Sequence, residues 1–259
     1  MEPITSTRNE KILLCHSLHR RKGREETGLF LVEGLRLCEE CLKRAPETVE
    51  FLLYGERLAD HPILLNAKEK GIPMFPVSEA AQKKASDSQQ SQGILLVAHM
   101  PHRADRQSQL GGDVLALSGI ADPGNMGAIL RSAWAFGIRD VLMDDGCVDA
   151  YNPKVVRSGM GAHFSIQLHQ VENLLVALQG LQKQAYTIIG GDMDGTPGGS
   201  STQEKRCIVI GGEAEGLSPE IKLCCDRLYS IPMVGGADSL NAAVAAGILM
   251  DRLLNRSDG

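Results

Sequence analysis

The sequence predicts an α/β protein in which a smaller domain precedes a larger domain built on a parallel sheet. The chain has 259 residues, a little under two average domains. Its hydrophobic content of 43% and charged content of 23% are ordinary for a globular protein and exclude a disordered or fibrous chain. Short apolar runs alternate with helical patterns along the chain, which is typical of strands that alternate with helices.

The first hundred residues predict the smaller domain. A short helix is expected over residues 10–20, with interruptions at Gly23 and Gly28. Residues 101–111 are polar and contain glycine and proline, so they are predicted to link domain 1–100 to domain 112–259. The prolines of 72–77 favour an edge strand. The other elements expected here are strands at 29–34, 49–55, 72–77 and 93–100, and helices from 35 to about 44 and over 61–71.

The second half alternates more strictly and predicts parallel βαβ units. Such sheets bind ligands outside the carboxyl ends of their strands. The chemistry is therefore expected just after Ile120, Asp192, Gly212 and Met233. The expected strands are 114–120, 141–145, 165–169, 186–192, 207–212 and 228–233, and the expected helices are 127–137, 153–160, 171–184, 218–225 and 239–255.

The seven cysteines and the N-terminal sequence bear on the cellular compartment of the protein. An odd number of cysteines, without an apolar leader at the N-terminus, favours reduced thiols and a cytoplasmic protein. No run reaches the roughly 18 apolar residues of a membrane span. Cys38 and Cys41 form a CxxC, but they share a helical pattern with Leu35 and Leu42, which favours a helix core face over a metal site.

Charge is distributed unevenly along the chain. The net charge is −5, which alone does not suggest a nucleic-acid partner. Residues 8–24 nevertheless hold six basic residues against the single acid Glu10. An RNA-binding surface and a solvated helix and turn are both compatible with this run. Its basic residues are Arg8, Lys11, Arg20, Arg21, Lys22 and Arg24.

The first candidate loop runs from Ile120 through DPGNMGAILRS. A glycine-containing turn from a strand into a helix offers backbone N–H groups to an anion. We expect the helix to open near Gly127 with Asn125 as its cap. Arg131, four residues after Gly127, could then bind a phosphate or stabilise a negative oxygen; a surface arginine is the alternative.

Two further loops follow predicted strands. After Ile210, the pair Gly211 and Gly212 permits close approach of the backbone to a ligand and leaves Glu213 at the mouth of the sheet; an ordinary loop glutamate is the alternative. The segment VGGADSLN (234–241) offers Ser239 as a helix cap, and small residues follow it. These small residues permit close backbone approach, although the segment alone favours a tight helix–sheet contact.

Together, these segments resemble one known family. DPGNMGAILRSAWAFGI, GGEAEGLSPE and IPMVGGADSLNAAVAAGILMDRLL are similar to the three motifs of the SpoU-type (TrmH-like) RNA ribose 2′-O-methyltransferases of the SPOUT superfamily, in order and spacing. NPKVVRSGMGAHF (152–164) resembles the segment between the first two motifs. FLVEGLRLCEECL and SQGILLV resemble an L30e-like RNA substrate-binding domain. Where the second motif commonly has Asn and Gly, this chain has Gly212 and Ala214.

The resemblance implies a fold and an assembly. The second domain would be a trefoil-knotted parallel-sheet domain, a connectivity that periodicity does not reveal. The protein would act as a homodimer with its active sites near the interface. It would transfer a methyl group from S-adenosyl-L-methionine (SAM) to a ribose 2′-hydroxyl of structured RNA, with no metal. Ribosomal RNA is favoured by the L30e-like domain, and both the target nucleotide and its base stay open.

Site residues follow from the same resemblance. The catalytic set would be Arg131, Asn125, Glu213, Ser239 and Asn241, with Arg131 acting electrostatically because a guanidinium holds its proton strongly. SAM would contact the backbone of Gly211, Ile231 and Leu240, with Gly212 and Met233 beside them. RNA phosphates would contact Arg20, Arg21, Lys22 and Arg24.

Other functions stay open at this point. A tRNA 2′-O-methyltransferase fits the same motifs. A catalytically silent RNA-binding homologue predicts loss of Arg131, Asn125 or Asn241, and all three are present. A nicotinamide-dependent oxidoreductase predicts a GxGxxG after the first strand of the second half, and this motif is missing.

Overall fold

The computed structural model describes residues 2–88, 91–101, 110–197, 205–213, 215–235 and 239–254. The chain divides into two compact units. Unit 1 is Met1–Asp105 with Tyr151–Phe164, and unit 2 is Arg106–Ala150 with Ser165–Gly259. The predicted boundaries leave residues 151–164 in the second domain, whereas these contacts group them with unit 1. Most of the predicted linker 101–111 lies outside the described residues. No helix in the described ranges is long and apolar enough to cross a membrane.

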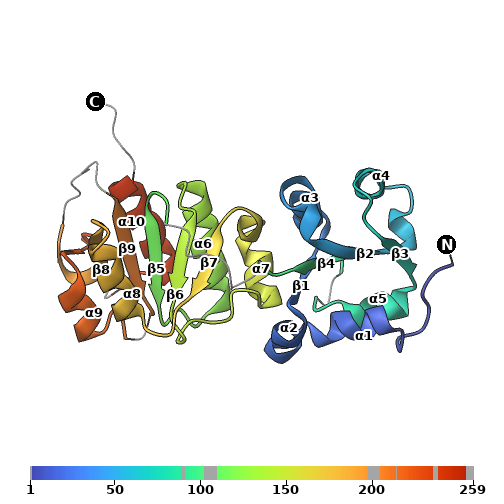
Figure 1. Cartoon of the computed structure of the whole chain (residues 1–259), viewed down its shortest axis with the longest axis horizontal. Coiled ribbons are helices and arrows are strands. Elements are labelled where there is room, and N and C mark those ends of the chain that lie inside the picture. Colours follow the sequence, from blue (N-terminus) through green and yellow to red (C-terminus); the bar gives the residue numbers. More distant parts are fainter. Residues whose placement is uncertain are drawn as a thin grey trace. The chain divides into compact units, whose positions relative to one another are not determined.

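Unit 1 is built on a four-stranded mixed sheet of order β1-β4-β2-β3 (Figure 1). Strand β4 runs antiparallel to β1 and β2, and β2 runs parallel to β3. The proline-containing β3 lies at the edge, as predicted, because proline cannot donate to a neighbouring strand. The strands are β1 (Leu29–Glu33), β2 (Val49–Gly55), β3 (Met74–Val77) and β4 (Ile94–His99).

Helices cover both faces of this sheet. Alternate residues of a strand face opposite sides: Phe30 and Val32 pack with α3 and α4, whereas Leu29 and Leu31 pack with α1 and α5. The predicted core role of Cys38 and Cys41 is confirmed, and burial raises the pKa of Cys41 to about 12. The helices are α1 (Glu10–Ser17), α2 (Arg21–Thr27), α3 (Leu35–Arg44), α4 (Pro62–Glu69) and α5 (Glu79–Ala85), which the sequence analysis missed.

The predicted interruption at Gly23 is wrong. Gly23 is buried inside α2, and a Cβ there would lie 2.3 Å from the carbonyl oxygen of Ser17. Glycine therefore serves a close approach between α1 and α2 rather than a break. Gly28 does end α2, with φ of 69°, a left-handed conformation that glycine adopts without strain.

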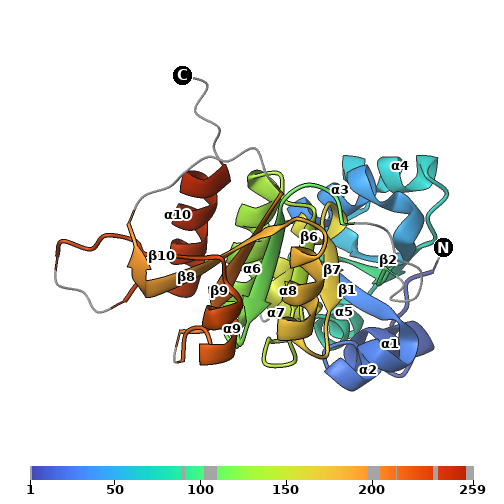
Figure 2. The ribbon, with the colours of Figure 1, turned by 60° about the vertical axis from the view of Figure 1, so that its left-hand side comes forward.

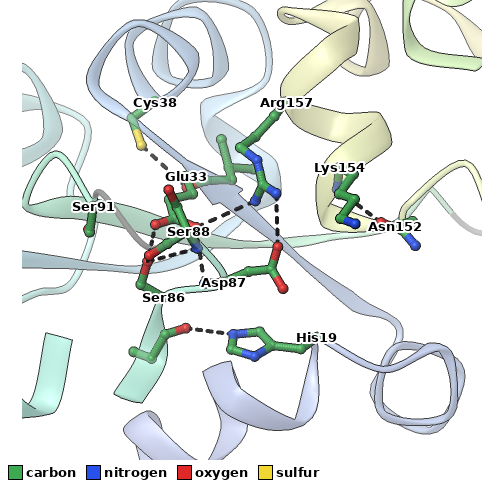
Figure 3. A network of polar contacts seen from close by, with 12 residues as sticks. His19, Glu33, Cys38, Ser86, Asp87, Ser88, Ser91, Asn152, Lys154 and Arg157 are labelled. Atoms are coloured by element: carbon green, nitrogen blue, oxygen red, sulfur yellow. Dashed lines mark hydrogen bonds and ion pairs between the residues drawn. The ribbon is translucent and has the colours of Figure 1, made fainter. Parts of the chain in front are cut away.

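Residues 151–164 pack into unit 1 through both apolar and charged contacts. Val156 on α7 (Pro153–Gly159) lies in the same core cluster as Phe30, and the rings of Tyr151 and Phe30 are 5.0 Å apart. Arg157 donates from Nη2 to Oδ2 of Asp87 at 2.9 Å, and its Nη1 lies 3.7 Å from Oε2 of Glu33 (Figure 3). Glu33 is a buried carboxylate, so Arg157 supplies its countercharge.

Unit 2 is built on a six-stranded sheet of order β10-β8-β9-β5-β6-β7, in which every pair is parallel. This confirms the predicted class of sheet. Strand β5 pairs with both β6 and β9, so the direction in which successive strands are added to the sheet reverses at β5. Loops distant in sequence therefore meet at the carboxyl ends of these strands. The strands are β5 (Val114–Ser118), β6 (Asp140–Met143), β7 (Gln167–Gln170), β8 (Thr187–Thr196), β9 (Arg206–Gly211) and β10 (Arg227–Tyr229).

Two pairs of helices lie against this sheet (Figure 2). Helices α8 (Leu174–Gln182) and α9 (Pro219–Cys224) pack with Val114 and Ala116 of β5. Helices α6 (Pro123–Ala135) and α10 (Ala242–Leu254) pack against each other, and α10 also contacts β8 and β9. Among the described residues, three short 3₁₀ helices lie at Pro46–Thr48, Glu56–Leu58 and Ala162–Phe164.

A buried arginine fixes the far end of α10. Arg206, only 2% exposed at the start of β9, donates from Nε and Nη2 to Asp113 at 3.0 and 2.8 Å. Its Nη1 donates to the carbonyl oxygen of Leu253 in the last turn of α10. A cation at a helix C-terminus complements the helix dipole. The anchored helix then presents its N-terminus at the carboxyl ends of the strands, where the candidate site lies.

Candidate active site

A cavity of about 310 Å³ lies at the carboxyl ends of β8 and β9 and beside the N-terminal half of α10. All five residues predicted to contact a cofactor line it: Gly211, Gly212, Ile231, Met233 and Leu240. The strand pattern explains this convergence, because parallel strands end at the same edge of the sheet. Two of the predicted catalytic residues, Glu213 and Ser239, line the same cavity.

Three predicted catalytic side chains meet in one hydrogen-bond network. Asn125 donates from Nδ2 to Oε1 of Glu213 at 2.6 Å. Asn241 donates from Nδ2 to Oδ1 of Asn125 at 2.8 Å and to Oε1 of Glu213 at 3.0 Å. The network joins α6, the loop after β9 and the start of α10. It therefore fixes all three predicted loops relative to one another.

The helix caps differ from the predicted ones. Helix α6 starts at Pro123 rather than near Gly127, and Asp122 is its cap, accepting from the backbone N–H of Asn125 at 2.8 Å. Asn241, not Ser239, caps α10, because its Oδ1 accepts from the N–H groups of Ala243 and Val244. Aspartate and proline at the start of α6 are the usual helix-start signal, so the true boundary was readable from the sequence. Both asparagines keep their amide N–H groups for the network.

Gly211 and Gly212 are required by the backbone around them. A Cβ on Gly211 would lie 2.3 Å from the carbonyl carbon of Gly216, and one on Gly212 would lie 2.3 Å from the carbonyl oxygen of Gly119. These atoms belong to the loop after β9 and to the loop after β5. Glycine here permits the close packing of the loops that form the cavity wall. The sequence predicted a close approach of this backbone to a ligand, and the structure adds a close approach of the two loops to each other.

The cavity carries more acidic groups than the motifs indicated. Asp192, at a predicted strand end, lines the cavity and pairs with Lys222, with 2.7 Å between Oδ2 and Nζ. The hydrogen bond with Asp192 raises the pKa of Lys222. Asp194 and Glu215 also line the cavity. The carboxylates give the cavity a negative character that suits a ligand with positive charge.

Of the five predicted catalytic residues, Arg131 is the one that neither lines the cavity nor joins the hydrogen-bond network. Its side chain is exposed on α6 and makes no hydrogen bond or ion pair with any residue in the described part of the chain. It follows Asn125 by six residues, which places it about 120° away around the helix. A single chain therefore gathers Asn125, Glu213, Ser239 and Asn241 without Arg131.

The predicted RNA-binding residues separate into two groups. Arg24 is 2% exposed and donates from Nη1 to the carbonyl oxygen of Leu18 at 2.7 Å, so its expected phosphate contact is wrong for this fold. Arg21 pairs with Glu25 at 2.7 Å and Lys22 with Glu26 at 3.7 Å on α2. Arg20, by contrast, is exposed. The sequence pattern could not distinguish these cases because it does not show which charges are paired or buried.

Comparison with known families agrees with this geometry. Residues 113–251 match the SpoU rRNA Methylase family, and residues 9–96 match the MRM3-like substrate binding domain. The parallel sheet with its loop cavity thus belongs to a methyltransferase class, and unit 1 to a class of substrate-binding domains. The chain is a member of the SpoU rRNA Methylase family.

Named relatives resemble the chain over nearly its whole length. It is 33% identical over 255 residues to the 23S rRNA (guanosine(2553)-2′-O)-methyltransferase RlmP of Bacillus subtilis, covering 98% of this chain and 99% of the relative. It is 31% identical over 236 residues to the 23S rRNA (guanosine-2′-O-)-methyltransferase RlmB of Escherichia coli, covering 85% and 96%. The crystal structure of the SpoU methyltransferase AviRb from Streptomyces viridochromogenes in complex with AdoMet is similar with a TM-score of 0.79 and 26% identity, covering 93% of this chain and 96% of that chain.

Proposed function

We propose that this protein transfers a methyl group from SAM to a ribose 2′-hydroxyl of ribosomal RNA. The observation that carries this proposal is the network of Asn125, Glu213 and Asn241, which joins all three motif loops beside one cavity. The family membership supports the reaction class. The two named relatives, both 23S rRNA enzymes that match along most of this chain, favour ribosomal RNA over tRNA.

The cavity residues fit SAM. The volume of the cavity, about 310 Å³, is at the lower end of the usual range for small-molecule sites. Ile231, Met233 and Leu240 offer apolar surface for an adenine, while Glu213 and Glu215 offer negative charge for the sulfonium and amino groups. Gly211 and Gly212 bring the backbone close. When bound, SAM supplies a methyl group on a positively charged sulfur that is a good leaving group.

The side chains of the network position the reacting groups. Oε1 of Glu213 accepts from Asn125, from Asn241 and, at 3.4 Å, from the backbone N–H of Ala242, so the carboxylate is held in one orientation. Its other oxygen and the hydroxyl of Ser239 are available to orient a ribose. Holding the acceptor oxygen in line with the methyl donor lowers the entropic part of the barrier. Arg131 would stabilise the negative charge that develops on the 2′-oxygen.

Arg131 supports a dimeric active site. Because it lies away from the cavity of its own chain, we propose that it reaches the cavity of a second copy in a homodimer. Val244 on α10, 51% exposed, offers apolar surface on a neighbouring helix for that contact. The trefoil knot is also part of this proposal. All seven cysteines are free, which supports a reducing, cytoplasmic location.

Calorimetric titration followed by a transfer assay tests the proposed function. We expect the purified chain to bind SAM and not NAD. We then expect it to transfer labelled methyl groups to unmodified 23S rRNA transcripts and not to unmodified tRNA transcripts. Methylation of tRNA alone would contradict ribosomal RNA as the substrate. Binding of NAD without SAM would contradict methyl transfer as the reaction.

A further inference from the structure

Helices α1 and α5 pack against each other on one face of the unit 1 sheet. Ile12, Cys15 and Leu18 from the N-terminal segment share a core cluster with Ala81 and Ala85 of α5. This packing brings together polar groups that are more than sixty residues apart in the sequence. The outer surface of α1 and α5 differs from the one predicted from residues 8–24, because Lys84 of α5 belongs to it and the buried Arg24 does not.

Four basic side chains gather on this surface. Nζ of Lys84 lies 3.0 Å from Nε2 of His16, and the rings of His16 and His19 are 5.0 Å apart in an edge-to-face arrangement. Nε2 of His19 lies 2.9 Å from the carbonyl oxygen of Ala85 (Figure 3). Arg20 follows directly and is close enough to His16 to act on its charge. We call His16, His19, Arg20 and Lys84 the α1–α5 basic face.

Acidic groups do not compensate this face. None of its four members forms an ion pair with a carboxylate among the residues that the structure describes. The charged groups that act on His16 are Lys84, His19 and Arg20, all of them basic. His16, whose pKa lies below 6.5, is uncharged at neutral pH and accepts from Nζ of Lys84, so Lys84 and Arg20 carry the fixed positive charges of this face. They are therefore a ready site for a partner that supplies negative charge.

The neighbouring α2 shows the opposite arrangement. Arg21 and Lys22 each pair with a glutamate one turn later, and Arg24 is buried. The basic residues on α2 and those beside α5 thus differ in how available they are to an external anion. The half on α2 is neutralised within its own helix, whereas the half next to α5 recruits a further lysine from a distant segment.

We propose that the α1–α5 basic face is the surface of unit 1 that binds the phosphate backbone of the RNA substrate. This inference rests on the proposed function, because it takes RNA as the substrate. Lysine and arginine neutralise phosphates and release counterions. Imidazole rings add planar surfaces on which unstacked bases can stack, which an acidic protein partner would not use. RNA is therefore the polyanion that this mixture of side chains fits best.

Salt-dependent binding of an unmodified 23S rRNA transcript by the full chain tests the proposal. The test variant is Arg20→Ala with Lys84→Ala. The matched control is Arg21→Ala with Lys22→Ala, which removes the same formal charge from the paired helix. We expect the test variant to bind about tenfold more weakly or worse, with a plot of log K against log salt concentration shallower by about 1.4–1.8 for two lost phosphate contacts. We expect the control to stay within about twofold of wild type.

The outcomes separate this inference from the function on which it rests. Equal losses in the two variants would mean that only net charge matters and would overturn the assigned face. Full RNA affinity in the test variant would also overturn it and would leave the face to an acidic protein or another anion. SAM titration and methyl transfer at saturating RNA, measured on the same wild-type sample, test the function itself. A wild-type protein that neither binds nor methylates RNA contradicts the proposed function instead.

Discussion

Asn125 and Glu213, 88 residues apart in the sequence, are joined by a hydrogen bond of 2.6 Å from Nδ2 to Oε1. Asn241 donates to both of them. Since each residue comes from a different motif loop, the bond makes the position of Glu213 depend on α6 and α10. Oε1 of Glu213 accepts from both asparagines, and hydrogen bonds to a charged acceptor are stronger than those between neutral groups, so their loss is costly.

Replacement of Glu213 by glutamine tests this dependence. Glu213→Gln keeps the shape but removes the charge and places an N–H group among donors. Hydrogen bonds to charged groups contribute about 1.5–3 kcal/mol, so we expect single-turnover methyl transfer to fall about 10- to 100-fold. Glu215→Gln removes a charge from the same cavity lining without touching the network, and it serves as control when both variants are measured at saturating SAM. Equal effects of the two changes would contradict a positioning role for the network.

Gly211 gives a second prediction. In Gly211→Ala the new Cβ would meet the backbone of Gly216 and Leu217 at 2.3–2.7 Å, so the loop after β9 must move. We expect SAM affinity to fall more than about tenfold, because close-packed sites tolerate little added volume. Gly180→Ala in α8, where a Cβ meets no atom within 4 Å, is the control and should leave SAM binding unchanged. Normal SAM binding by Gly211→Ala would show that this loop does not form the cavity wall.

The strand pattern of the sequence predicted which loops form the site, and the family resemblance supplied the individual residues. The predicted end of β9 lies within one residue of the observed end, whereas β8 extends four residues beyond Asp192 and β10 ends four residues before Met233. Gly211, Ile231 and Met233 nevertheless line one cavity. The burial of Arg24 could not be predicted, since it depends on the close approach of α1 and α2 at Gly23. The grouping of residues 151–164 with unit 1 was equally hidden, because the motif order assigns them to the methyltransferase domain. Both features depend on long-range packing, which residue types and spacing do not report.

Arg157 gives a prediction on stability. Its removal leaves the 7% exposed Glu33 without a countercharge. Breaking a fully buried pair costs about 3–5 kcal/mol. Because the Arg157 side chain is 32% exposed, we expect Arg157→Ala to lower the free energy of unfolding by only about 2 kcal/mol. Urea denaturation measures this value, with the exposed Arg36→Ala as control. Equal stability of both variants would mean that Glu33 gains its stability from Ser86 and the backbone alone.

His16 provides a test of pH dependence. Desolvation, followed by the charges of Lys84, His19 and Arg20, lowers the pKa of His16 below 6.5. The folded state therefore binds this proton less readily than the unfolded chain. Stability from neutral His16 is full above pH 6.5 and is lost as the pH falls through the lowered pKa. We expect Lys84→Ala to raise the pKa of His16 in an NMR titration, though only in part because desolvation is the larger cause. An unchanged pKa would contradict the contact.

Arg131 tests whether the active site is shared. We expect Arg131→Ala to abolish methyl transfer while SAM affinity stays within a few fold, because this side chain lies away from the cavity of its own chain. Mixing Arg131→Ala with Glu213→Gln, after exchange of subunits, should restore transfer above that of either variant alone. Mixtures no more active than the separate variants would place Arg131 and Glu213 in the same chain's site.

The position of the transferred methyl group tests the central claim most directly. Unmodified 23S rRNA would be incubated with the protein and SAM, digested with nuclease, and analysed by mass spectrometry. A ribose 2′-O-methyl group blocks cleavage of the adjacent phosphodiester, because the 2′-oxygen can no longer attack it. We predict a nuclease-resistant dinucleotide with one added methyl group on its ribose, absent without SAM. A methyl group on a base, or RNA left unmodified by a protein that binds SAM, would contradict the account.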